Sequence, residues 1–169
     1  MHVPEHQEQR FKVQKGRDIH EERKRVNAGY LRKKLGVIER QNDMELNAVH
    51  LNLRGKVDEV LWLDDGTMAS LDYKYAENKH RIFKNHKVQA ALYGILITAN
   101  YEKPVEKAFL CYTRSKYEIV TFTLDDKLKD EARRALQDCL DVIQTGYFPP
   151  PTEWTARCPD CCYRNLCIG

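Results

Sequence analysis

The turn signal Asp64-Asp65-Gly66 constrains the fold of this chain more than any other feature. It lies between Gly55–Leu63 and Thr67–Tyr73, two segments whose apolar residues alternate or run together as they do in strands. An Asp-Gly pair between two such segments is a strong short-range signal for a β-hairpin. If the loop has three residues and its glycine takes a positive φ, Leu63 lies opposite Thr67.

The same register brings two acidic residues together. Because side chains on a strand alternate between its two faces, Asp58 then lies opposite Asp72, and Lys74 shares a face with Asp72. A two-residue loop would put Asp58 and Asp72 on opposite faces of the hairpin. A hairpin with three loop residues therefore predicts a site of two carboxylates and one ammonium group.

Two carboxylates and a lysine on neighbouring strands suit metal-assisted hydrolysis of a phosphodiester. Carboxylates that share a half-buried site repel each other, and a divalent cation removes that repulsion. Ligands that are all oxygen atoms favour Mg²⁺ or Mn²⁺, which lowers the pKa of a bound water while Lys74 assists at the phosphate. The triplet Asp72-Tyr73-Lys74 alone is also typical of an exposed strand, so the other motifs have to support the interpretation.

The remaining pattern predicts an α/β fold, a mixed sheet flanked by helices, over residues 1–150. We expect, in order, a helix over about Lys12–Leu35, strands over Asn47–Leu53, Gly55–Leu63 and Thr67–Tyr73, a helix over Phe83–Asn100, strands over Lys107–Thr113 and Glu118–Leu124, and a helix from Asp125 or Asp126 to about Thr145. The predicted core contains Val57, Val60, Leu61, Leu71, Leu92, Ile95, Phe109 and Val120. Pro149-Pro150-Pro151 is a stiff spacer that leads to a second, cysteine-rich unit, residues 151–169, packed on the first.

Composition and charge limit the class of protein. The chain of 169 residues is 42% hydrophobic and 31% charged, as soluble proteins are, and no apolar run is long enough to span a membrane. The charged opening is not a signal peptide, so we expect a cytoplasmic protein.

The net charge of +3 is unevenly distributed along the chain, because residues 1–40 hold eleven Lys or Arg against six Asp or Glu. Such a cluster suits a nucleic-acid backbone, and it equally suits solvated helix faces.

The tail from residue 151 holds four of the six cysteines within its last twelve residues. Thiolates at the spacing of Cys158, Cys161 and Cys167 can surround one metal centre, which would attach this short polar tail to the rest of the chain. Cys162 can hardly bind the same ion as its neighbour Cys161, which argues against a simple zinc site of four thiolates. Cys111 and Cys139 are interpreted as buried packing thiols.

Five motifs occur in a fixed order along the chain. They are Gly16-Arg17-Asp18-Ile19-His20, Gly55-Lys56-Val57-Asp58, Asp72-Tyr73-Lys74, Gln89-x-x-x-Tyr93 and Cys158-x-x-Cys161-x5-Cys167. In this order and spacing the chain resembles the RecB-like branch of the PD-(D/E)xK nucleases, and most closely the CRISPR-associated exonuclease family four.

The resemblance implies roles for individual residues. His20, Asp58 and Asp72 would ligate the metal together with the carbonyl of Tyr73, and Lys74 would be the catalytic lysine. Gln89 and Tyr93, one helical turn apart on one face, would position DNA at the site. Without the resemblance, His20 is a surface histidine on a charged helix, and Gln89 and Tyr93 are packing residues.

The resemblance also implies an iron-sulfur cluster held by Cys158, Cys161, Cys167 and a fourth cysteine before the first helix. No cysteine precedes Cys111, so we expect that the N-terminal segment with that ligand is missing from this chain. Four alternatives follow: the natural start lies upstream, Cys162 substitutes, the tail binds zinc, or it binds no metal.

The function that the resemblance implies is a metal-dependent exonuclease acting on single-stranded DNA ends. It would trim DNA for capture as CRISPR spacers, alongside the CRISPR integrase and its companion subunit. One alternative is the nuclease module of a RecB- or AddB-like recombination system. Another is a DNA-binding scaffold subunit without catalytic activity.

Overall fold

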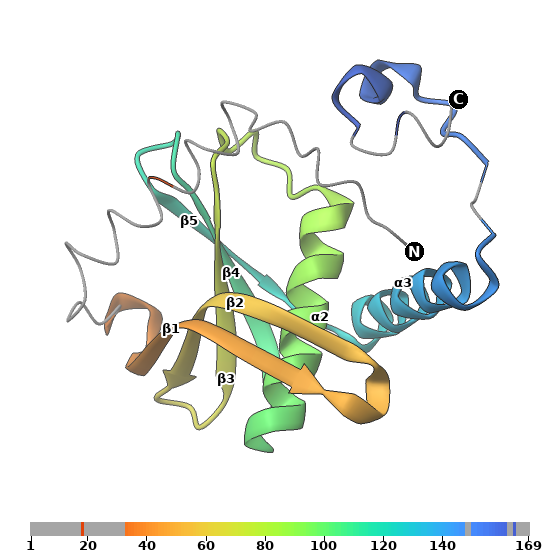
Figure 1. Cartoon of the computed structure of the whole chain (residues 1–169). Helices are drawn as coiled ribbons and strands as arrows, with labels where there is room; N and C mark the ends of the chain where they lie inside the picture. The colour runs from red at the N-terminus through yellow and green to blue at the C-terminus, as the bar shows by residue number, and fades with distance from the viewer. Residues whose placement is uncertain (1–17, 19–32, 148–149, 162–163, 165–169) are drawn as a thin grey trace.

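The protein, described by a computed structural model over residues 18, 33–147, 150–161 and 164, is built on one five-stranded sheet (Figure 1). The elements in chain order are η1 (Lys33–Leu35), β1 (Val37–Ala48), η2 (Val49–Leu51), β2 (Leu53–Leu63), β3 (Met68–Lys74), α2 (Lys84–Tyr101), β4 (Val105–Tyr112), β5 (Glu118–Thr123), α3 (Asp126–Thr145) and η3 (Thr155–Asp160). This confirms the predicted order of three strands, a helix, two strands and a helix. The helix predicted at Lys12–Leu35 lies largely outside the described residues.

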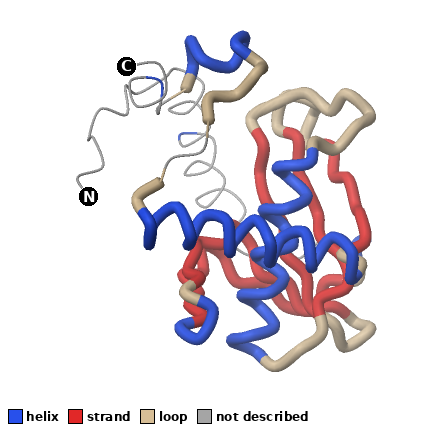
Figure 2. Tube along the Cα trace, turned by 90° about the vertical axis from the view of Figure 1, so that its right-hand side faces the viewer, coloured by secondary structure: helices blue, strands red, loops and turns tan. Residues whose placement is uncertain are grey.

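The sheet is mixed, as predicted. Strands β1, β2 and β3 pair antiparallel, β3 and β4 pair parallel, and β4 and β5 pair antiparallel. A parallel pair needs a crossover connection, and α2 supplies it between β3 and β4. Helix α2 packs against strands β1 to β4, and α3 crosses α2 (Figure 2).

The hairpin of β2 and β3 has the predicted three-residue loop. Leu63 N–H donates to the Thr67 carbonyl at 3.0 Å, and Gly66 adopts φ +81°. The ladder then continues by single steps from Trp62 opposite Met68 to Glu59 opposite Leu71. The register that the sequence predicts is therefore the one that the chain adopts.

Strand β1 differs from the prediction. A strand at Asn47–Leu53 is wrong for most of its length, because β1 ends at Ala48 and the 3₁₀ helix η2 follows. Val49 is 76% exposed, and Asn52 takes the left-handed conformation with φ +50°, which a short polar side chain tolerates. β1 lies at the edge of the sheet and exposes several polar side chains, so its sequence lacks a clear strand pattern.

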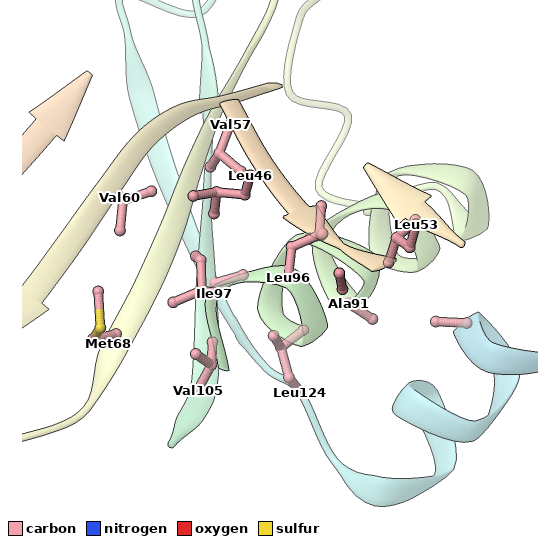
Figure 3. Packing of buried hydrophobic residues seen from close by; sticks show 14 of the residues in the cluster. Leu46, Leu53, Val57, Val60, Met68, Ala91, Leu96, Ile97, Val105 and Leu124 are labelled. Atoms are coloured by element: carbon pink, nitrogen blue, oxygen red, sulfur yellow. The ribbon is translucent and has the colours of Figure 1, made fainter. Parts of the chain in front are cut away.

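The core lies on both faces of the sheet. On the α2 side, residues of strands and helices form one buried cluster that includes Val57, Val60, Leu96 and Ile97 (Figure 3). On the other side, Leu61, Leu71, Phe109 and Cys111 belong to a second cluster. Of the predicted core residues, Val57, Val60, Leu61, Leu71 and Phe109 are buried, whereas Leu92, Ile95 and Val120 are only partly buried.

Helix α3 has the predicted ends. The Asp125 carboxylate accepts a hydrogen bond from Leu128 N–H at 2.8 Å, and Gly146 caps the C-terminus with φ +67°. The buried residues of α3, Leu128 and Ala132, lie in its first half. Cys139 lies beyond them and is exposed, so the prediction of a buried packing thiol is right for Cys111 and wrong for Cys139. No helix of the described residues is long and apolar enough to cross a membrane.

The cap of α3 gives a test of stability. Asp125→Ala removes the acceptor for Leu128 N–H and should lower the free energy of unfolding by about 1 kcal/mol. Asp138→Ala, in the exposed middle of the helix, should instead leave stability unchanged or raise it slightly, because alanine has the higher helix propensity. Urea unfolding followed by circular dichroism measures both, and equal effects of the two substitutions would contradict the assigned cap.

Candidate active site

Asp58, Asp72 and Lys74 come from neighbouring strands at the point where the β2–β3 ladder ends. Glu59 and Leu71 are the last paired residues, and Asp58 and Asp72 are the next residues on their strands. The Asp58 carboxylate accepts a hydrogen bond from the backbone N–H of Tyr73 at 2.9 Å. Lys74 Nζ lies 2.6 Å from Asp72 Oδ2, and Asp72 is 5% exposed. The three predicted residues are thus brought together.

Gln89 and Tyr93 of α2 complete the cluster. Lys74 Nζ donates a hydrogen bond to Gln89 Oε1 at 2.7 Å, and Gln89 Nε2 donates to the Tyr93 hydroxyl at 2.9 Å. The spacing of four residues places Gln89 and Tyr93 on one face of the helix. Five predicted side chains therefore form one arrangement, in which a strand lysine is held between a carboxylate and a helix amide.

The electrostatic environment keeps the Tyr93 phenol protonated. Burial, and then the negative charge of Asp72, raises the pKa of Tyr93 to about 12, with a smaller contribution from Asp58. The hydrogen bond from Gln89 acts in the opposite direction. Because Gln89 donates to the phenol oxygen, the hydroxyl proton of Tyr93 stays available for an acceptor.

His86 is a residue near the site that the sequence analysis missed. It precedes Gln89 by three residues on α2, so the two lie on the same side of the helix. Burial, and then the positive charge of Lys74, lowers the pKa of His86 below its ordinary value. The signal in the sequence was the spacing His86, Gln89, Tyr93 along one helix face.

A buried ionic cluster lies behind the two acids, on the opposite face of the sheet. Glu59 follows Asp58 on β2, so strand alternation directs it to that face. It is 3% exposed and lies 3.3 Å from Arg40 Nη1 of β1. The Tyr73 hydroxyl donates a hydrogen bond to the same carboxylate. Tyr73 therefore binds Glu59 through its side chain and Asp58 through its backbone, which links the two faces. Arg40 was missed because its pairing appears only once β1 is aligned with β2.

The donor set suits a hard divalent cation. Within the part of the chain that the structure describes, no three His, Cys, Asp or Glu side chains gather as metal ligands. Asp58 and Asp72 supply carboxylate oxygens, which match ions such as Mg²⁺ that bind few protein groups and keep several waters. The predicted third ligand, His20, lies outside the described residues, and the Tyr73 carbonyl stays a prediction.

Only part of the cysteine tail is described. Cys158 and Cys161 are free thiols, and Cys161 N–H donates to the Cys158 carbonyl at 3.1 Å, so the two residues share one tight turn. Cys162 and Cys167 lie outside the described residues. The metal centre predicted for the tail therefore stays a prediction.

Comparison with known proteins gives a family. The model of the PD-(D/E)XK nuclease superfamily matches residues 2–168. The CRISPR-associated exonuclease Cas4 of Thermoproteus tenax is 30% identical over 157 residues, which is 93% of this chain and 78% of that protein. The protein of the same name from Francisella tularensis subsp. novicida is 27% identical over 128 residues, 76% of this chain and 62% of that protein.

Solved structures show the same fold. The crystal structure of SSO0001 matches 90% of this chain and 68% of that chain, with a TM-score of 0.54 and 19% identity. A putative exonuclease from Eubacterium rectale matches 91% of this chain and 59% of that chain, with a TM-score of 0.52 and 14% identity. Both structures therefore share the overall fold of this chain, although their sequences have diverged widely.

The raised pKa of Tyr93 predicts how stability depends on pH. The phenol ionises near pH 10 in the unfolded chain and near pH 12 in the folded chain, so alkaline conditions favour unfolding in this range. Between pH 10 and 12 the native chain should lose more unfolding free energy than Tyr93→Phe, as measured by urea unfolding. The exposed Tyr147→Phe should behave like the native chain, and parallel curves for native and Tyr93→Phe would contradict the buried phenol.

Proposed function

Because the chain belongs to the PD-(D/E)XK nuclease superfamily, and within it to the family of the CRISPR-associated exonuclease Cas4, we propose that it trims single-stranded DNA ends during CRISPR spacer acquisition. Family membership makes it a CRISPR-associated DNA nuclease, a hydrolase of phosphodiester bonds. Single-stranded substrate, metal identity and the step in spacer acquisition are our inference. The CRISPR integrase and its companion subunit are the partners that this role requires.

The contact of Lys74 with both Asp72 and Gln89 is the observation that carries the proposal. Nucleases of this superfamily typically use divalent metals, and we assign the metal to Asp58 and Asp72, with His20 and the Tyr73 carbonyl as further ligands. When bound, the metal lowers the pKa of a water and stabilises the charge that develops on the phosphate. Lys74 has a fixed position beside the acids, from which its ammonium neutralises charge on the scissile phosphate. Gln89 holds that ammonium and, together with Tyr93, positions the DNA.

Mg²⁺ and Mn²⁺ are the ions that we assign to this site. Carboxylate and carbonyl oxygens favour hard cations, and a histidine nitrogen in the ligand set is compatible with Mn²⁺. For the tail, we infer a second centre, iron-sulfur or zinc, held by Cys158, Cys161 and Cys167. The tight turn between Cys158 and Cys161 supports this second centre, because two thiolates on one turn can bind the same ion.

A surface next to the site suits unpaired bases. The segment between β3 and α2 carries Phe83, which is 42% exposed, with the Arg81 guanidinium 5.4 Å from its ring centre. Tyr75 has the Arg114 guanidinium 5.9 Å from its ring centre. Aromatic rings accompanied by arginines bind single-stranded nucleic acid by stacking and by attraction to phosphate. This arrangement favours single-stranded DNA as the substrate.

The activity is tested with single-stranded DNA labelled separately at each end. With Mn²⁺ or Mg²⁺ the native chain should degrade the DNA, and EDTA should abolish degradation. Asp72→Asn should lower the rate by at least about 10³-fold, since a metal ligand supplies several kcal/mol of transition-state stabilisation. The order in which the two labels are released gives the polarity.

The control for that test is Asp138→Asn, an exposed acid on α3, which should cleave at the native rate. DNA binding without cleavage by the native chain in either metal would contradict the proposal. That result would favour a scaffold subunit.

A substitution of Lys74 distinguishes a role in catalysis from a role in metal binding. Lys74→Met removes the positive charge beside Asp72, so Mn²⁺ should bind at least as tightly as in the native chain, while cleavage falls by about 100-fold or more. Calorimetry measures Mn²⁺ binding and the labelled DNA measures cleavage. Lys107→Met, which breaks an ion pair with Asp65 at the hairpin loop, should change neither. Weaker Mn²⁺ binding with native cleavage would contradict the assigned role of Lys74.

A further inference from the structure

Several buried polar atoms near the acidic site have no hydrogen-bond partner. In the part of the chain that the structure describes, they include Ser70 Oγ, His86 Nδ1 and the Tyr112 hydroxyl. Such atoms are rare in folded proteins because burying a polar group without a partner costs free energy. Tyr112 is the most informative of the three, since it is 1% exposed and lies beside Lys74.

The sheet register determines the direction of Tyr112. In the parallel pairing of β3 and β4, Lys74 lies next to Tyr112. Phe109 and Cys111 belong to the cluster on the far face, so strand alternation directs Tyr112 to the face that α2 covers. Lys74 lies on this face, since its Nζ contacts Gln89 of α2.

The Tyr112 hydroxyl is kept as a neutral donor. Burial, and then the charges of Asp72 and Glu118, raises the pKa of Tyr112 above its ordinary value, so the phenol stays protonated at neutral pH. The hydroxyl is close enough to Asp72 for this effect and forms no hydrogen bond with it. A protonated phenol beside Lys74 and near Asp72 can donate to an anionic oxygen that enters the site.

We propose that Tyr112 is a further catalytic residue, whose hydroxyl donates a hydrogen bond to a non-bridging oxygen of the scissile phosphate next to Lys74. This inference rests on the proposed nuclease activity. It explains why a tyrosine, rather than a phenylalanine of nearly the same shape, occupies a buried position where the hydroxyl has no protein partner.

Tyr112→Phe tests the proposal because a catalytic hydrogen-bond donor and a purely structural residue predict different results. Since the hydroxyl has no protein partner, its removal should leave the melting temperature unchanged or slightly raised. Cleavage of single-stranded DNA with Mn²⁺ should fall about 10- to 100-fold in kcat, as expected for the loss of a hydrogen bond to a charged group. Mn²⁺ affinity should stay at the native value. Tyr147→Phe, at an exposed tyrosine after α3, should keep native stability and cleavage.

A sulfur substitution identifies the atom that Tyr112 contacts. A single phosphorothioate at the cleaved position, as separate stereoisomers, replaces one non-bridging oxygen at a time. If Tyr112 donates to that oxygen, the penalty of Tyr112→Phe should shrink several-fold with one stereoisomer and persist with the other. Native cleavage by Tyr112→Phe, or equal penalties with both stereoisomers, would overturn the contact while the nuclease function stands. Absence of cleavage by the native chain would overturn the proposed function and the role of Tyr112 together.

Discussion

The site depends on the register of one hairpin. A slip of one residue between β2 and β3 would turn Asp58 and Asp72 to opposite faces of the sheet, and no metal could bind both. The three-residue loop sets this register, and the hydrogen bond from Tyr73 N–H to the Asp58 carboxylate holds it at the site itself. On the far face, the buried pair of Arg40 and Glu59 ties β1 to β2 at the same level. Both faces of the sheet therefore stabilise one alignment.

Charge balance then determines what the site can do. Two carboxylates lie next to one ammonium group, which contacts Asp72 and is held by Gln89. Burying each of these charges costs free energy unless the charge has a partner. Lys74 and a divalent cation together would therefore neutralise the two acids. The neutral phenols of Tyr93 and Tyr112 add donors without adding charge. With a divalent cation bound, the acids and Lys74 together would carry a net positive charge, which favours a negatively charged substrate such as a phosphodiester.

The sequence predicted those features that depend on local chemistry. The turn residues gave the hairpin and its register, the helical spacing placed Gln89 and Tyr93 on one face, and Asp125 gave the start of α3. Features that depend on packing between distant segments were missed. The edge strand β1 carries no clear pattern, the partner of Glu59 lies on another strand, and the place of Tyr112 follows from a parallel pairing made through the α2 crossover.

A crystal structure of the chain with Mn²⁺, with anomalous diffraction recorded above and below the manganese edge, would show whether Asp58 and Asp72 bind one metal ion. We expect a single strong anomalous peak at the acidic site, about 2.1 Å from carboxylate oxygens of both Asp58 and Asp72. Lys74 should then stand beside the ion. A peak bound by only one of the two acids, or no peak between β2 and β3 while DNA is still cleaved, would show that Asp58 and Asp72 do not share a catalytic metal ion.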